Sequence, residues 1–174
     1  LISVNSYIIK PDGYSIPYNS EKIHGISTEI ALKEGKKLGD ILKEFEKDLL
    51  RSKYIIGHNI KFDINIVGAE HYRKNFKSSI EDKLKIDTAI ISKSFCNLQG
   101  GLGGGLKMPK LIEMYESLFG EKFSDAHDAS FDVNATAKSF FKLAELGEYK
   151  NDDISKENIQ YLSLIHISEP TRHR

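Results

Sequence analysis

The residues that could do chemistry gather at the start of one helical stretch. Residues 127–132 read His-Asp-Ala-Ser-Phe-Asp, and apolar residues then recur every three or four positions. On one helix, five steps of about 100° would turn Asp132 roughly 140° away from His127. The two side chains can therefore converge only if His127 precedes the helix and Asp132 lies in its first turns. An imidazole base beside a metal-holding carboxylate suits phosphodiester hydrolysis, whereas a solvated histidine and a surface aspartate are the plainer alternative.

A second group of polar residues follows an apolar run. Residues 54–63 read Tyr-Ile-Ile-Gly-His-Asn-Ile-Lys-Phe-Asp, which predicts a short buried strand that turns directly into a helix. Asp63 would lie in the first turn of that helix. The helix dipole favours a carboxylate at this position without any metal, so a purely structural role remains the alternative.

Together the two stretches resemble the DnaQ-like exonucleases, the family of the proofreading epsilon subunit of DNA polymerase III. The family's HNxxFD motif is matched by His58, Asn59, Phe62 and Asp63. Its later HxAxxD motif is matched by His127, Ala129 and Asp132. The segment His24-Gly25-Ile26 is similar to the family's HGI segment, and Asp87-Thr88 to its D-T strand. These landmarks occur in the family's order.

The resemblance implies a role for each matching residue. Asp132 would hold the metal that carries the attacking water, Asp63 would serve a second metal, and His127 would take the proton from that water. The cofactors would be two divalent ions, Mg²⁺ or Mn²⁺, which prefer carboxylate oxygens. His127, five residues before Asp132, indicates the DEDDh branch of the family. The substrate-binding residues implied are Ile23, His24, Asn59 and Phe62, and for His24 a turn-stabilising role is the alternative.

The same resemblance implies a ribonuclease-H-like α/β fold, a mixed sheet flanked by helices. Val4–Lys10 would be its third strand, so we expect this chain to lack the first two strands. The family's first motif, Asp-x-Glu on the first strand, is absent from the sequence. We therefore expect the protein to be a 3′→5′ exonuclease, but the chain as given to be inactive.

Three alternatives concern the substrate and the class of protein. The expected substrate is a single-stranded or frayed 3′ end, of DNA in a proofreading type, with a DNA polymerase subunit as a possible partner. An RNA-trimming member of the family is the second interpretation. A nuclease-like module without catalysis, which binds nucleic acid or another protein, is the third.

The domain organisation follows from the same motifs. Residues 1–150 are expected to form the truncated exonuclease domain, and residues 151–161 a C-terminal extension. Residues 162–172 read LSLIHISEPTR, which a transposase-type sequencing adapter would encode. We therefore interpret residues 162–174 as an adapter-derived tail and exclude them from the fold.

Composition narrows the class of protein further. With 174 residues, 40% of them hydrophobic and 29% charged, the chain has the composition of one ordinary globular domain. The 25 basic and 25 acidic residues cancel, so the net charge gives no indication of a polyanionic ligand such as nucleic acid. The single cysteine, Cys96, excludes an internal disulfide and suits a reducing compartment, so we expect a cytoplasmic location. No apolar run reaches the roughly 20 residues of a membrane span.

Sequence patterns also predict the elements around the motifs. Strands are expected at Val4–Lys10, Lys53–His58 (in a central, covered position) and Leu84–Thr88. Pro17 would lie in a loop, and Ser27 or Thr28 would cap a short helix. His71 would lie on the surface. Longer helices are expected at 37–50, 59–74, 89–95, 109–119 and 130–145.

Overall fold

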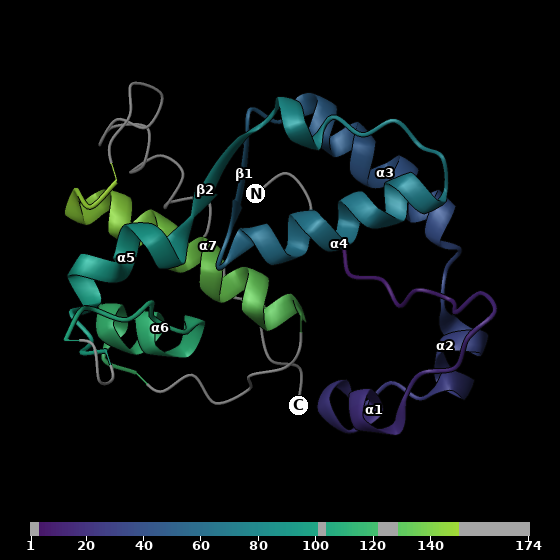
Figure 1. The fold of residues 1–174 in the computed structure, drawn as a ribbon, viewed down its shortest axis with the longest axis horizontal. Helices are drawn as coiled ribbons and strands as arrows, with labels where there is room; N and C mark the ends of the chain where they lie inside the picture. The colour runs from purple at the N-terminus through teal and green to yellow at the C-terminus, as the bar shows by residue number, and fades with distance from the viewer. Residues whose placement is uncertain (1–3, 101–103, 122–128, 150–174) are drawn as a thin grey trace, which may run out of the picture. The chain divides into compact units, whose positions relative to one another are not determined.

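The computed structural model describes residues 4–100, 104–121 and 129–149, and Figure 1 shows their fold. The chain divides into two compact units. One, here called the N-terminal unit, consists of Ser6–Asp87 together with Asp125–Asp132. The other, the C-terminal unit, includes Thr88–Ser124 and the chain from Val133 onward.

The centre of the N-terminal unit is a strand, a helix and a second strand that pairs with the first. Strand β1 (Tyr54–Gly57) leads into helix α4 (Ile60–Arg73), and the chain returns as β2 (Leu84–Asp87). The two strands run side by side and are parallel (Figure 1). Tyr54 lies opposite Leu84, and Gly57 lies opposite Asp87. The predicted ranges for all three elements are confirmed to within one or two residues. This crossover is the unit of α/β folds, so the predicted α/β class is confirmed.

Three further helices precede this crossover. They are α1 (Tyr18–His24), α2 (Thr28–Glu34) and α3 (Leu38–Arg51). Ser27 caps α2 as predicted, because its side chain accepts a hydrogen bond from the backbone N–H of Ile30 at 3.1 Å. Pro17 lies in a loop as expected, directly before α1 as its N-terminal cap, but the sequence did not predict α1 itself. Helix α1 buries none of its residues, so it lacks the apolar spacing by which a helix is recognised in sequence.

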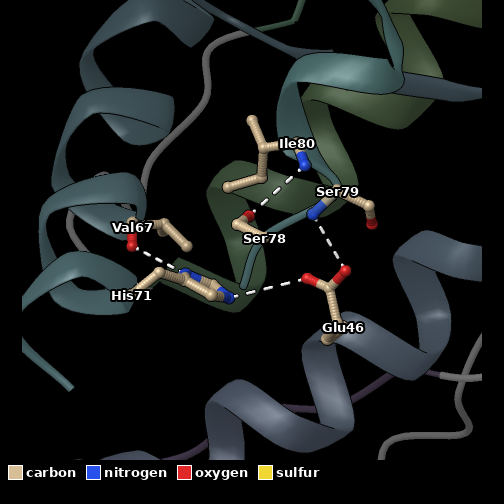
Figure 2. A network of polar contacts seen from close by, with 6 residues as sticks. All are labelled: Glu46, Val67, His71, Ser78, Ser79 and Ile80. Atoms are coloured by element: carbon tan, nitrogen blue, oxygen red, sulfur yellow. Dashed lines mark hydrogen bonds and ion pairs between the residues drawn. The ribbon is translucent and has the colours of Figure 1, made fainter. Parts of the chain in front are cut away.

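His71 is buried, which contradicts the expected surface position. Only 2% of its side chain is exposed, and its Nδ1–H donates to the carbonyl oxygen of Val67 at 2.8 Å. Its Nε2 lies 3.6 Å from a carboxylate oxygen of Glu46 on α3 (Figure 2). The other oxygen of Glu46 accepts from the backbone N–H of Ser79 at 2.9 Å. Glu46 thus connects α3 to α4 and to the segment before β2. Removal of the Glu46 carboxylate would leave the buried His71 side chain without this partner, at a cost of about 1–3 kcal/mol.

The strand expected at Val4–Lys10 is wrong for the residues described. Within residues 4–10 the backbone makes a single bridge, between Ile9 and Lys36. The covered position expected for β1 is also wrong, because β1 pairs with β2 alone in the described part of the chain and Ile56 is 37% exposed. Both errors have one cause: a β-rich segment becomes a strand only where a neighbour completes its ladder.

The C-terminal unit is helical in its described part. Its helices are α5 (Thr88–Cys96) and α6 (Leu111–Phe119), followed by α7 (Ala129–Leu146), whose first turn belongs to the N-terminal unit. Helix α6 begins at Leu111 because Glu113 accepts from the backbone N–H of Lys110 at 2.8 Å. It ends at Phe119 as predicted, and the next residue, Gly120, adopts the left-handed conformation with φ 70°. In the part of the chain that the structure describes, no helix is both long and apolar enough to cross a membrane.

Candidate active site

Asp63 lies at the surface, in the first turn of α4. Partial burial of its carboxyl group raises the pKa of Asp63 above the ordinary value, and the negative charge of Asp87 raises it further. The preceding residue, Phe62, is 62% exposed, so its ring is also accessible at the start of α4. A hydrogen bond from the backbone N–H of Asp63 acts in the opposite direction and lowers the pKa of this carboxyl group, but the net effect is a raised pKa.

The turn from β1 into α4 fixes the direction in which this helix starts. Asn59 adopts the left-handed conformation, with φ 57° and ψ 43°, which asparagine tolerates better than most residues. Its backbone N–H donates to Oδ1 of Asp87 at 2.9 Å. A Cβ atom added at Gly57 would lie 2.9 Å from Cγ1 of Ile60, so the close approach of strand and helix requires glycine.

Asp87 therefore has two effects at this site. It holds the N-terminus of α4 by accepting the hydrogen bond from Asn59, which is a structural role. It also faces Asp63 closely enough to raise that residue's pKa, an effect that the sequence did not predict. Both carboxylates lie at the carboxyl ends of the paired parallel strands, the edge where open α/β sheets bind their ligands.

The third motif lies partly outside the described residues. Helix α7 begins at Ala129 and carries Asp132 in its first turn, as its spacing predicts, and Asp132 is half-buried. Asp132 belongs to the N-terminal unit, like Asp63. His127 lies outside the described residues, so its role as a base remains a prediction.

The two residues expected to contact substrate from α1 lie at the C-terminal end of this helix. Ile23 is 63% exposed near the C-terminus of α1. His24 accepts a hydrogen bond at Nδ1 from the backbone N–H of Ile26, at 3.1 Å, across the left-handed Gly25. The turn-stabilising role considered for His24 is therefore present, and contact of either residue with a nucleotide remains a prediction.

The described residues supply only part of a site for two divalent ions. Carboxylate oxygens such as those of Asp63 are the donors that Mg²⁺ and Mn²⁺ prefer. Among the described residues, however, no group of three or more His, Cys, Asp or Glu side chains is arranged to hold a metal. The chemistry of the donors fits the predicted ions, but the number of donors within the described residues does not complete a two-metal site.

Removal of the charge on Asp87 should lower the pKa of Asp63. In Asp87→Asn the side-chain oxygen can still accept from Asn59, while the repulsion that raises the Asp63 pKa is gone. The folded chain binds the Asp63 proton more tightly than the unfolded chain, so ionisation of Asp63 lowers stability as pH rises through its folded-state pKa. Asp87→Asn should recover part of that stability at pH values above the folded-state pKa of Asp63. Carboxyl NMR titration measures the shift, with Asp82→Asn as control, and an unchanged Asp63 pKa would contradict the assignment.

Most of the chain matches a known protein family. A family model described as exonuclease, of RNase T type, matches residues 2–140. The crystal structure of E. coli exonuclease I in complex with a dA16 oligonucleotide superposes with a TM-score of 0.61 and 22% sequence identity. The match covers 90% of this chain and 34% of exonuclease I, so the chain spans about a third of that enzyme's length. This likeness confirms the predicted exonuclease fold of the ribonuclease-H-like class. The search of curated proteins gave no match.

Proposed function

We infer that this chain, which belongs to the RNase T exonuclease family, serves in metal-dependent removal of nucleotides from the 3′ ends of nucleic acid. The observation that carries this proposal is the setting of Asp63. Asp63 follows the carboxyl end of β1, on the side where open α/β sheets generally bind ligands, and partial burial and Asp87 raise its pKa. Such a carboxylate gains more from a bound cation than a fully solvated one does.

Each motif residue then has a defined task. Asp63 and Asp132 donate carboxylate oxygens to the divalent ions, Mg²⁺ or Mn²⁺. When bound, these ions polarise the scissile phosphate and lower the pKa of the attacking water. His127 takes the proton released by that water. Asn59 and Phe62, on the exposed side of the α4 start, and Ile23 and His24, at the end of α1, contact the terminal nucleotide.

The substrate that we propose is single-stranded or frayed DNA, in a proofreading role beside a DNA polymerase subunit in the cytoplasm. The solved structure of E. coli exonuclease I contains a dA16 oligonucleotide, which supports a DNA strand as the substrate of this fold. The single cysteine supports a reducing compartment. An RNA-trimming exonuclease, or a nuclease-like module without catalysis, is the alternative to test.

The test is degradation of an oligonucleotide labelled at its 5′ end, by an extended protein in which a family segment with Asp-x-Glu has been joined ahead of Leu1. We expect a ladder of products shortened one nucleotide at a time, which requires Mg²⁺ or Mn²⁺ and stops with a chelator. A 3′-phosphate should block the reaction, since the terminal nucleotide must enter the site. DNA and RNA of the same sequence are compared. Products cut internally, or no hydrolysis of either polymer, would overturn the proposal.

A further inference from the structure

A cleft of about 1010 Å³ lies at the far end of α4 from Asp63. It is lined by the segment from Ile9 to Tyr14, the start of α3, the end of α4 and the ring of Phe76. All of these residues belong to the N-terminal unit. None of them is part of the motifs discussed above, so the cleft has no role in the proposed chemistry.

The cleft carries more free positive than free negative charge. Two of its five basic side chains already form ion pairs, Lys74 with Asp12 at 3.1 Å and Arg73 with Glu70. The remaining three make no ion pair with any described residue, and they are Lys10, Lys37 and Lys43. The acidic side chain left over in the lining is that of Asp40. An anion would therefore meet three available ammonium groups and one carboxylate.

Aromatic rings stand among these lysines. Phe76 is half-buried, and Nζ of Lys43 lies 5.8 Å from the centroid of its ring. Gly39 faces the same ring, and a Cβ atom there would lie 3.5 Å from Cε2 of Phe76. Tyr14, in the opposite segment of the lining, is 62% exposed. Flat rings beside cations are the combination on which single-stranded nucleic acids bind, with bases stacked on the rings and phosphates at the lysines.

We propose that this cleft binds the backbone of single-stranded nucleic acid upstream of its 3′ end. The proposal rests on the proposed function for the choice of ligand, while the cleft itself is defined by its own residues. Along α4, Asp63 and Arg73 are about 15 Å apart at 1.5 Å per residue. At about 3.4 Å for each stacked nucleotide, a strand whose 3′ end lies at Asp63 reaches the cleft after roughly four or five nucleotides.

The experiment measures binding of a fluorescent 12-nucleotide single strand by anisotropy, with the chain as given and a chelator present. The triple variant Lys10→Gln, Lys37→Gln and Lys43→Gln should bind about 10- to 30-fold more weakly. Its slope of log affinity against log salt should be smaller by about two, at roughly 0.7 for each phosphate contact. The same three positions changed to Arg should retain the affinity. The control triple is Lys33→Gln, Lys47→Gln and Lys138→Gln, which makes the same change in net charge at exposed lysines outside the cleft.

The outcomes separate the cleft from the catalytic proposal. Equal losses of affinity in the two triple variants would overturn the proposal that the cleft binds the strand, because the effect would then be one of net charge. Equal affinity for a poly-glutamate peptide, with the same loss in the triple variant at Lys10, Lys37 and Lys43, would also overturn the proposal in favour of an acidic protein partner. A 4-thiothymidine five nucleotides from the 3′ end should crosslink to the peptide that contains Tyr14 or Phe76. Loss of affinity in the triple variant without this crosslink would support the cleft and contradict the placement of the 3′ end at Asp63.

Discussion

Replacement of His127 by alanine should slow the extended, Asp-x-Glu-containing enzyme by roughly 10²–10⁴-fold, the range expected for loss of a general base. Metal binding should remain largely intact, because the carboxylates of Asp63 and Asp132 are unchanged. The deficit should shrink as the pH is raised, since hydroxide then replaces part of the base. Single-turnover hydrolysis with saturating Mn²⁺ measures the effect without interference from product release.

The matched control is Asp128→Ala, which changes the next residue in the chain but no group assigned to the reaction. Its rate should stay within a few-fold of the unchanged enzyme. Calorimetric titration of both variants with Mn²⁺ shows whether the metals still bind. A His127→Ala enzyme with undiminished turnover would remove this residue from the mechanism. Loss of Mn²⁺ binding in the same variant would instead make His127 a metal ligand.

The chain as given should show no turnover above a buffer blank. Its sequence contains no Asp-x-Glu, and Asp63 and Asp132 alone supply too little negative charge to hold two cations against their mutual repulsion. Titration with Mn²⁺ should therefore reveal at most one ion, with a dissociation constant of about millimolar. The setting of Asp63 agrees with this expectation, because its described neighbours include a single second carboxylate, that of Asp87.

The extended protein is the control for this measurement, and it should bind two ions per chain. Asp63→Asn in the chain as given should abolish the remaining weak site. Two tightly bound ions in the unextended chain would contradict the prediction, and would mean that carboxylates outside the motifs complete the shell.

The elements that the sequence predicted well are those whose stability is local. Helix α3 presents a strong apolar face, and the start of α2 is set by one serine hydroxyl. The prediction failed where the deciding interaction is with another segment. The residues of Val4–Lys10 have the composition of a strand, but strand formation depends on a ladder partner that composition does not reveal.

His71 shows an error that the spacing could have prevented. Charged residues nearby in the sequence favour a surface position for His71, yet it continues the face of α4 that carries Ile60, Ile64 and Val67. Steps of four, three and four residues keep these side chains on one side of a helix. The partner of His71 could not have been found in this way, because Glu46 is on α3 and only the packing of the helices brings the two together.

In the candidate site, the motifs predicted where the two carboxylates lie on their helices but not the charge repulsion that acts on Asp63. The sequence placed Asp63 and Asp132 correctly in the first turns of their helices. The repulsion between Asp63 and Asp87 depends on the register of two parallel strands, in which Asp87 lies opposite Gly57. A register cannot be read from either strand alone, so this effect required the structure.

The parallel pairing of β1 with β2 makes the folding of the N-terminal unit depend on α4. Tyr54 meets Leu84 thirty positions further along the chain, and closing so long a loop without internal structure is entropically costly and slow. Helix formation takes about 0.1–1 μs, so α4 can form first and shorten the free chain between the strands. Substitutions that slow the formation of α4 therefore also slow assembly of the sheet, whereas those that weaken only the strand pairing mainly accelerate unfolding.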